Sequence, residues 1–209
     1  QELTHSDTAV REGIANQPTA DEAEALRALA TAVLDPLRAA IGRAIKVNSG
    51  YRGPDLNRRI GGSRTSQHVE GKAADIQSPG MSVLELFQAV IRNRLPFDQL
   101  IYEARSPTSK WVHVSHNPGA NRGEIRTAEF DANGRPLRYP LISEEKALAM
   151  SEPTLRGGGE PLELEYREIG DEPEDVASPA QRARATKTRA RKAAVPRARK
   201  AKAPKRGRG

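Results

Sequence analysis

The 209-residue sequence contains no cysteine, so neither a disulfide bond nor a thiolate metal site can be part of its structure. A zinc site would have to be built from histidine, aspartate and glutamate side chains. Aromatic residues are also scarce, at 4% of the chain, and hydrophobic residues make up only 36%. Because a typical globular domain is richer in apolar residues, we expect part of the chain to lie outside any packed core.

Long hydrophobic runs are missing as well. No apolar stretch approaches the roughly 18 residues of a membrane-spanning helix, and no signal-peptide pattern is visible. We therefore expect no transmembrane segment. The sequence does not indicate an oligomeric state.

Acidic residues are absent from the end of the chain. Residues 181–209 hold 13 of the 34 lysines and arginines and no aspartate or glutamate. The other 21 basic residues are outnumbered by the 27 acidic ones, so a mildly acidic body carries a strongly basic tail. The tail is low in complexity and cannot bury a core. Residues 141–180 are predicted to be an acidic linker or arm with glycines, prolines and one short helix at SEEKALAM.

Turn signals and periodic apolar residues predict one folded domain at residues 1–140. Short strands are expected at 44–49, 99–103 and 110–115. Asn133-Gly134 is typical of a hairpin turn. Elements in the order β-α-β and then β-β favour an α+β domain with a small, largely antiparallel sheet and flanking helices.

Two capping boxes indicate where helices begin. Thr19 with Glu22 opens a helix that extends to about residue 41, and Ser82 with Glu85 opens another that ends near residue 92. Pro36 falls within the first helix and is expected to bend or break it.

The stretch SRTSQHVEGKAADI, residues 63–76, places His68 seven residues before Asp75. Gly71 permits a tight turn between them, and Asp75 lies in a run that otherwise has the character of a buried strand. An unpaired carboxylate is costly to bury, and a metal ion shared with His68 would remove that cost. The alternative is a simple hydrogen bond between the two side chains.

A third candidate ligand lies in the predicted strand WVHVS. Strand alternation places Trp111, His113 and Ser115 on one face. Near His68 and Asp75, His113 would complete three protein ligands with an open fourth position, the pattern of a catalytic zinc site. The alternative is a core histidine bonded to a backbone carbonyl.

The pattern S-x-H-x-x-G-x-A-x-D resembles the signature of the M15 zinc peptidases. It is formed by Ser66, His68, Gly71, Ala73 and Asp75. Several other stretches resemble the D-Ala-D-Ala carboxypeptidase branch of that family: ELTHSDTAVREGIANQP near the N-terminus, SGYR at 49–52, Asn57, Gly61-Gly62 and WVHVS. The resemblance covers about residues 2–118.

This resemblance implies a fold shared with bacteriophage endolysins and the Hedgehog signalling domain. It implies Zn²⁺ held by His68, Asp75 and His113, and a peptidoglycan stem peptide as the substrate of a D,D-carboxypeptidase or endopeptidase. The implied site of action is the cell wall or periplasm, for a bacterial enzyme, a released phage lysin or an enzyme carried on a virion.

A metallopeptidase also needs a general base, and Glu103 is the candidate. If the last two predicted strands form a hairpin with Glu103 opposite Trp111, Glu103 lies diagonal to His113 at roughly 5–8 Å. The alternative is an ion pair of Glu103 with Arg105 or Lys110 at the hairpin mouth. In one respect the sequence departs from related M15 branches, which carry an acid or a histidine two to six residues before the last ligand. Here 107–111 offer neither.

Arg52 in SGYR is predicted to bind a substrate carboxylate through two parallel hydrogen bonds. Its alternative partner is Asp55 across the turn. Ser66 and Gln67 are expected to add polar contacts to the substrate near the metal.

The tail indicates a second activity. Its 13 positive charges favour non-specific binding to DNA, to an anionic wall polymer such as teichoic acid or to an anionic membrane surface, through counterion release. It has no aromatic residue to stack on bases, so reading of a nucleic-acid sequence is not expected. The alternative is a solvated tail that only increases solubility.

Two functions therefore stand side by side. One is a cell-wall zinc peptidase whose basic tail holds it on an anionic surface. The other is a structural or DNA-associated particle protein that retains an M15 fold with reduced activity. The complete His-Asp-His set favours the first, and the histone-like composition of the tail keeps the second open.

Overall fold

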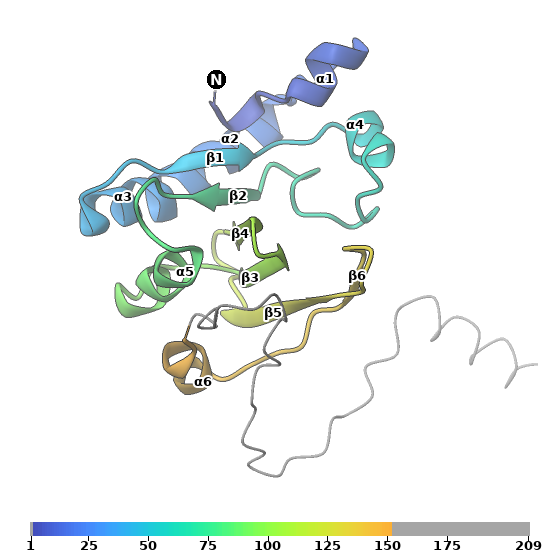
Figure 1. The fold of residues 1–209 in the computed structure, drawn as a ribbon. Helices are drawn as coiled ribbons and strands as arrows, with labels where there is room; N and C mark the ends of the chain where they lie inside the picture. Colours follow the sequence, from blue (N-terminus) through green and yellow to red (C-terminus); the bar gives the residue numbers. More distant parts are fainter. Residues whose placement is uncertain (1, 152–209) are drawn as a thin grey trace, which may run out of the picture. The chain divides into compact units, whose positions relative to one another are not determined.

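A computed structural model describes residues 2–151 (Figure 1). The rest of the predicted acidic arm and the basic tail lie outside the described residues. The elements are a 3₁₀ turn (Glu2–Thr4), α1 (Asp7–Glu12), α2 (Ala20–Leu29), a π-helical turn (Ala30–Leu34), α3 (Asp35–Ile41), β1 (Lys46–Ser49), α4 (Pro54–Arg59), β2 (Ala73–Gln77), α5 (Val83–Arg92), β3 (Gln99–Ser106), β4 (Ser109–Ser115), β5 (Glu124–Phe130), β6 (Pro136–Arg138) and α6 (Glu144–Ala149). Across these residues, no helix combines the length and apolar character that crossing a membrane requires.

Both predicted capping boxes are confirmed. The side chains of Thr19 and Glu22 cap α2, and those of Ser82 and Glu85 cap α5, each pair with both reciprocal hydrogen bonds. The interruption expected near Pro36 is also confirmed. Proline has no N–H to donate to the preceding turn, and the chain passes through the π-helical turn before α3 begins.

The six strands form one mixed sheet in the order β1-β2-β4-β3-β5-β6. The pair β3–β5 is parallel, with Gln99 opposite Glu124, and the other strand pairs are antiparallel. The α+β class is confirmed, but the prediction of a small, largely antiparallel sheet is wrong, because the sheet is larger and mixed.

The parallel pair arises because β4 is already flanked by β2 and β3, so the next strand has to join a free edge. The chain leaves β4 at Ser115, whose carbonyl oxygen accepts a hydrogen bond from Asp98 N over 2.7 Å. It then passes the start of β3, where Glu124 N donates to Asp98 O over 3.0 Å. β5 therefore begins at the same end of the sheet as β3 and runs in the same direction.

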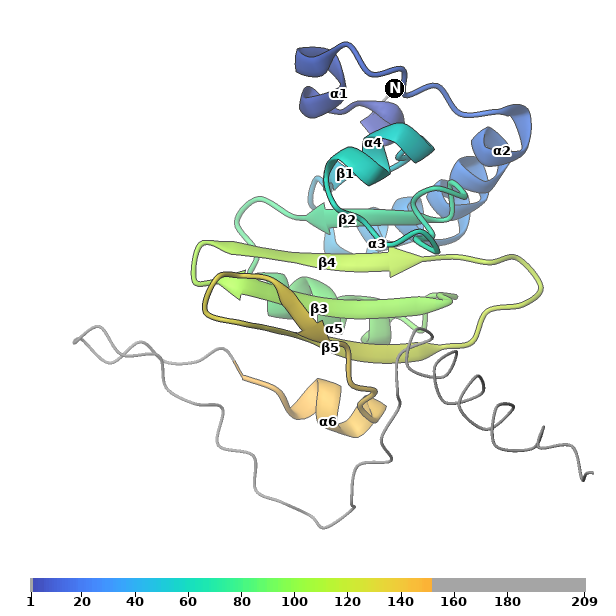
Figure 2. The same ribbon diagram turned by 90° about the vertical axis from the view of Figure 1, so that its right-hand side faces the viewer.

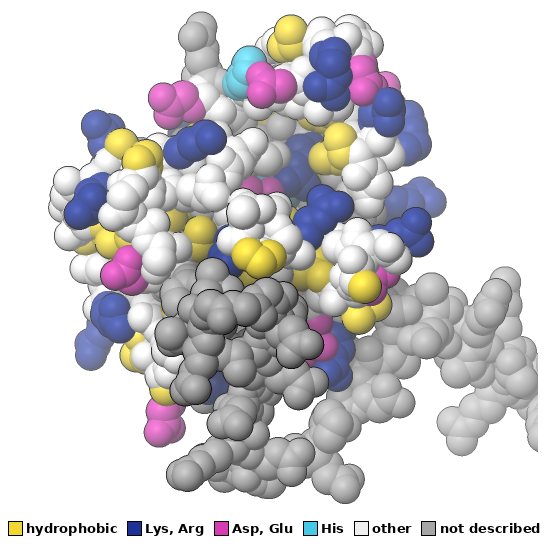
Figure 3. All heavy atoms as spheres, viewed as in Figure 1, with side chains coloured by type: hydrophobic (Ala, Val, Ile, Leu, Met, Phe, Trp, Pro, Cys, Tyr) yellow, Lys and Arg dark blue, Asp and Glu magenta, His cyan; other side chains and the backbone are white. Residues whose placement is uncertain are grey.

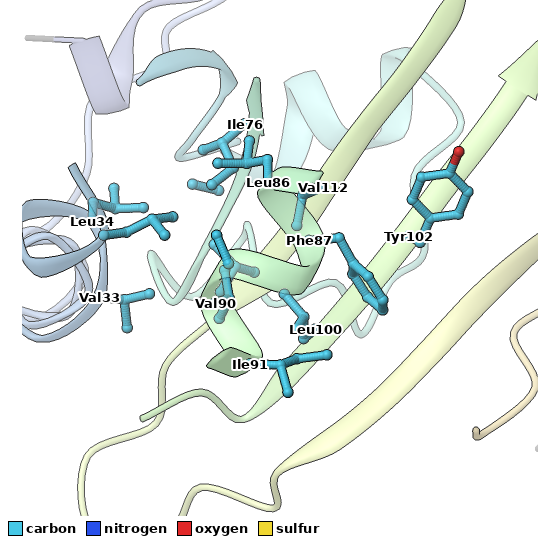
Figure 4. Packing of buried hydrophobic residues seen from close by; sticks show 14 of the residues in the cluster. Val33, Leu34, Ile76, Leu86, Phe87, Val90, Ile91, Leu100, Tyr102 and Val112 are labelled. Atoms are coloured by element: carbon cyan, nitrogen blue, oxygen red, sulfur yellow. The ribbon is translucent and has the colours of Figure 1, made fainter. Parts of the chain in front are cut away.

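Side chains of the central strands alternate between two faces of the sheet. On the first face, Phe87 and Val90 of α5 pack against Leu100 of β3 and Val112 of β4 (Figure 4). All four are fully buried. Because each such side chain contributes about 1.5–3 kcal/mol when buried, this helix-covered face supplies much of the folding free energy.

The second face is partly covered by β6, which returns from β5 and crosses in front of the sheet, whereas α5 lies behind the sheet (Figure 2). The hairpin turn predicted at Asn133-Gly134 is confirmed. The side chain of Asp131 accepts hydrogen bonds from the backbone N–H groups of Asn133 and Arg135, and Gly134 has a φ of 70° that favours glycine.

The short helix expected at SEEKALAM is α6, and it packs on α5. The side chain of Gln88 donates hydrogen bonds to the backbone oxygens of Ala147 and Met150, each over 3.0 Å. Ala147 is fully buried in the apolar core. This part of the predicted arm is therefore packed against the helix-covered face of the sheet.

Candidate metal centre

The turn that follows His68 depends on Gly71. This glycine has a φ of 68°, and a Cβ at its position would lie 2.3 Å from the carbonyl oxygen of Glu22. A side chain is excluded there by both the backbone conformation and the space. The turn leads directly into β2 and returns the chain so that Asp75 lies beside His68.

Three buried side chains converge at this point: His68 from the turn, Asp75 from β2 and His113 from β4. Asp75 and His113 are direct cross-strand partners. Asp75 Oδ1 lies 3.2 Å from His68 Nε2 and 3.0 Å from His113 Nδ1, and the two ring nitrogens are 3.2 Å apart. The structure therefore brings together the three residues that the sequence predicts as metal ligands.

The orientation of His68 is set by the backbone. Its Nδ1 lies 2.7 Å from the carbonyl oxygen of Gly50. A carbonyl oxygen only accepts hydrogen bonds, so we assign the ring hydrogen to Nδ1. Nε2 can then donate a hydrogen bond to Asp75 when it carries a hydrogen, and would present its lone pair to a metal ion when it does not, as in histidines that bind a metal.

Asp75 carries the negative charge of the cluster. Burial alone would raise the pKa of its carboxyl, but His68 and His113 outweigh burial and hold this pKa well below its usual range. Asp75 is therefore an ionised carboxylate, the form that binds a cation.

Arg52 borders the cluster on the other side of Asp75. It donates to Asp75 Oδ2, and its Nε donates to Ser49 Oγ over 2.7 Å. Asp55, its alternative partner, instead pairs with Arg58. Contact between Arg52 and a substrate carboxylate stays a prediction.

Glu103 lies directly opposite Trp111, which confirms the predicted hairpin register. The residue is 8% exposed. Burial, and then the negative charge of Asp75, raise the pKa of Glu103 to about 7, against the opposing effect of His113. Among the described residues no ion pair joins Glu103 to Arg105. A carboxyl with this pKa can both accept and release a proton near neutral pH.

The cluster and Glu103 line one cleft of about 710 Å³. The residues around it come from the segments on either side of α4, from β2 to β5, and from the β5–β6 hairpin and the residue after it: Arg52, Ile60, Gly61, Gly62, Ser63, Thr65, Ser66, Gln67, His68, Asp75, Gln99, Ile101, Glu103, Arg105, Trp111, His113, Arg126, Phe130, Gly134, Pro136 and Tyr139. A hollow of about 770 Å³ near α1 is lined by residues between Glu2 and Gln17, so it does not include the cluster.

Aromatic residues from the hairpin region form part of the cleft wall. The ring of Phe130 meets Trp111 edge to face, with 6.4 Å between the ring centres. Burial, and then the charges of Glu103 and Asp75, raise the pKa of Tyr139 to about 12. Tyr139 therefore remains a neutral phenol beside the acidic groups of the site.

Ser66 and Gln67 both line the cleft, where the sequence predicts substrate contacts. Gln67 Nε2 donates to Asp98 Oδ2 over 2.6 Å. Asp98 is 1% exposed, and its hydrogen bonds with Arg122 are the main cause that lowers its pKa to about 2. Asp98 is not among the predicted site residues. The signal that points to it is a carboxylate directly before the strand that carries Leu100, Ile101 and Tyr102.

The donor set fits zinc. Two imidazole nitrogens and one carboxylate oxygen lie within 4.8 Å of one another, and all three residues are buried. Histidine and carboxylate ligands are those that zinc uses where no cysteine is present. Because the three residues also line the cleft, a substrate in the cleft can reach an ion that they hold.

The comparison with known protein families agrees with this geometry. Residues 1–115 match the family described as Peptidase M15, a stretch that ends with β4 and includes the three candidate ligands and Glu103. No curated protein matches the chain. M15 peptidases are generally zinc-dependent, in agreement with the donor set. The match covers more than half of the sequence and confirms the resemblance seen in the motifs, so the chain belongs to the peptidase M15 family.

Proposed function

We propose that this peptidase is a zinc enzyme that hydrolyses peptidoglycan stem peptides, as a D,D-carboxypeptidase or an endopeptidase. One observation carries the proposal: a buried His68, Asp75 and His113 cluster lines the same cleft as the buried carboxyl of Glu103. A metal site and a proton acceptor on one sheet face are the two parts that metal-assisted peptide hydrolysis needs.

The metal site and Glu103 have different roles in the proposed hydrolysis. When bound, zinc supplies Lewis acidity that polarises the peptide carbonyl and makes water more acidic. Glu103 takes the proton of the attacking water onto its carboxylate and then delivers it to the leaving amine nitrogen. A pKa of about 7 suits both transfers, because neither protonation state of Glu103 is strongly favoured at neutral pH.

The composition of the cleft supports an anionic peptide as the substrate. Three arginines line it, namely Arg52, Arg105 and Arg126. Figure 3 shows further Lys and Arg side chains at the surface on the side where α4 and β6 lie. Stem peptides carry free carboxylates, which guanidinium groups bind well. In the proposal Arg52 binds such a carboxylate through the N–H groups that Ser49 and Asp75 leave unused, and Ser66 and Gln67 contribute polar contacts.

The basic tail, residues 181–209, completes the proposal. It binds DNA or an anionic wall polymer without sequence preference and keeps the peptidase close to an anionic surface. The proposed site of action is the cell wall or periplasm, reached by a bacterial enzyme, a released endolysin or a virion-borne enzyme.

The test of the peptidase uses Glu103→Gln, which keeps the size and polarity of the side chain and removes the proton acceptor. We expect zinc content to be retained and hydrolysis of purified peptidoglycan to fall by about 100-fold or more. Glu70→Gln is the matched control, because Glu70 is exposed and pairs with Lys72. Unchanged hydrolysis in Glu103→Gln would assign the proton transfer to another group. If the zinc-loaded native chain leaves peptidoglycan intact, the particle-protein alternative is favoured.

The test of the tail is a truncation of residues 181–209. Turnover of a small stem peptide should remain nearly unchanged, because every candidate site residue lies before residue 116. Binding to DNA or intact walls should collapse, and binding by the full chain should weaken steeply with salt. A flat salt titration, with equal affinity in both forms, would contradict this role.

A further inference from the structure

Arg105 occupies an irregular position at the end of β3. In the β3–β4 hairpin, Ala104 lies opposite Lys110 and Ser106 lies opposite Ser109, so Arg105 is an extra residue with no cross-strand partner. A bulge of this kind re-aims one side chain and is common beside active sites. Here the re-aimed side chain lines the metal-bearing cleft, on the same strand as Glu103.

The β5–β6 turn holds the side chain of Arg105 in place. A Cβ on Gly134 would lie 2.6 Å from Arg105 Nε and 3.1 Å from its Cγ. The arginine stem therefore runs directly beneath a glycine whose φ of 70° already disfavours any other residue. The stem therefore lies against the turn, while the residue as a whole is exposed.

The other two arginines of the cleft already have partners. Arg52 donates to Asp75 and Ser49. Arg126 donates to Glu124 Oε2 over 3.1 Å and to the backbone oxygen of Tyr139 over 2.6 Å.

Arg105 differs from both. Within residues 2–151, no hydrogen bond or ion pair engages its guanidinium group. A guanidinium without an acceptor, at the wall of a cleft, offers a planar pair of donors to an incoming anion.

We infer that Arg105 is a specificity-determining residue that binds a carboxylate of the substrate peptide close to the scissile bond. The inference rests on the proposed peptidase function. Two residues along a strand span about 6.5 Å, so Arg105 lies roughly that far beyond Glu103. An extended peptide covers the same span in about two residues. The bound carboxylate therefore belongs to a residue within two positions of the bond that is cut.

Two carboxylates of a stem peptide meet this requirement: the C-terminal carboxylate and the free carboxylate of an internal acidic residue. Either one would have to enter a cleft that already contains the ionised carboxylate of Asp75 and the partly ionised carboxyl of Glu103. A cation at Arg105 offsets that repulsion and aligns the peptide through two parallel hydrogen bonds. The shared chemistry is one carboxylate and one guanidinium, and the experiment separates the two sources.

The experiment uses the zinc-loaded full chain and two pairs of synthetic stem peptides. The first pair differs only in a C-terminal carboxylate or amide, and the second only in a free or amidated internal carboxyl. For Arg105→Gln, KM should rise about 10-fold or more on the carboxylate member of one pair. KM on its amide partner should change less than about 2-fold, and kcat should stay close to native. The peptide pair for which Arg105→Gln no longer prefers the carboxylate member over the amide member shows which substrate carboxylate Arg105 binds.

Arg135→Gln is the matched control, because Arg135 adjoins Gly134, is exposed and does not line the cleft. It removes the same charge and should leave all four KM values unchanged. Arg105→Lys keeps the positive charge without the planar guanidinium, so its KM on the carboxylate peptide should lie between those of the native chain and Arg105→Gln. The inference would be overturned if Arg105→Gln raised KM equally on both members of each pair, or if Arg135→Gln raised KM by the same factors.

Binding keeps this test separate from the test of peptidase function. Trp111 is the only tryptophan in the sequence and lines the same cleft, so its fluorescence reports peptide binding without turnover. If the native chain hydrolyses none of the peptides, the proposed function fails, and the fluorescence titration still decides on Arg105. A carboxylate preference that Arg105→Gln abolishes supports the inference, and equal binding of acid and amide by the native chain refutes it.

Discussion

The two faces of the central sheet are built from alternate residues of the same strands, yet they contribute to the folding free energy with opposite sign. On one face, Leu100 and Val112 are sealed beneath α5 in a wholly apolar environment. On the other, Asp75, Glu103 and His113 are also buried but carry ionisable groups. The first face gains free energy from burial. The second costs free energy, because ionisable groups are removed from water.

This difference indicates that the apolar face provides stability and that the metal-bearing face provides the reactive groups. The metal-bearing face is tolerated because the apolar face supplies the stabilising free energy, and because the ionised Asp75 is paired with His68, His113 and Arg52. Damage to the apolar face should lower stability without changing the chemistry, whereas damage to the metal-bearing face should do the reverse. The following predictions test this separation, from the largest expected effect to the smallest.

His113→Ala should abolish zinc binding and reduce peptide hydrolysis to background, because two ligands remain where the site needs three. Metal analysis of the purified variant, together with a hydrolysis assay, measures both effects. His5→Ala is the control, since His5 is exposed, pairs with Asp7 and does not line the metal-bearing cleft. Full zinc occupancy in His113→Ala would remove this residue from the ligand set.

Phe87→Ala should lower the free energy of unfolding by about 3–5 kcal/mol, because it leaves a cavity beneath the sheet. Phe87 is fully buried. Denaturant unfolding gives the change, and the folded fraction should retain the zinc affinity of the native chain. Val10→Ala, at a position that is 74% exposed, should have almost no effect. A large loss of zinc affinity in folded Phe87→Ala would show that the two faces are not separable.

Asp98 should make the stability pH-dependent in acid. Its pKa is about 2 in the folded chain and about 3.9 in an unfolded one, so its contribution is complete above about pH 4 and lost as the pH falls towards 2. The shift corresponds to about 2 kcal/mol. Between pH 5 and 2, unfolding measurements should show the native chain losing about that much more stability than Asp98→Asn. Parallel curves for the two proteins would mean that this carboxyl is not coupled to folding.

Local signals in the sequence predict much of the fold and of the site. Capping residues place the start of α2 and α5, because caps act within one helical turn. The opposition of Glu103 and Trp111 follows from a short hairpin whose register has few alternatives. The spacing of His68 and Asp75 around Gly71 is compatible with a metal site but also with a simple hydrogen bond, and the family resemblance together with His113 is what favours the metal site.

The features that the sequence did not reveal depend on non-local contacts. The parallel pairing of β5 with β3 is decided by which sheet edge is still open, and strand alternation carries no information on that choice. The short helix α4 is hidden in a stretch whose Gly53-Pro54 suggests only a turn. The pairing of Arg52 with Asp75 joins residues 23 positions apart, and Asp55 is a nearer alternative in sequence.

The cross-strand pairing of Asp75 with His113 also bears on how the protein acquires its metal. His68 and Asp75 are 7 residues apart and can meet early in folding, whereas the contact between Asp75 and His113 spans 38 residues. Contacts that close a long loop form late. A register slip of one residue would also move His113 to the apolar face. Tight zinc binding should therefore follow the docking of β4. When refolding is followed by stopped flow, the signal of a zinc-sensitive dye should change later than the signal of helix formation. In the cell, only chains whose β4 has paired in the correct register would then bind zinc tightly and become active.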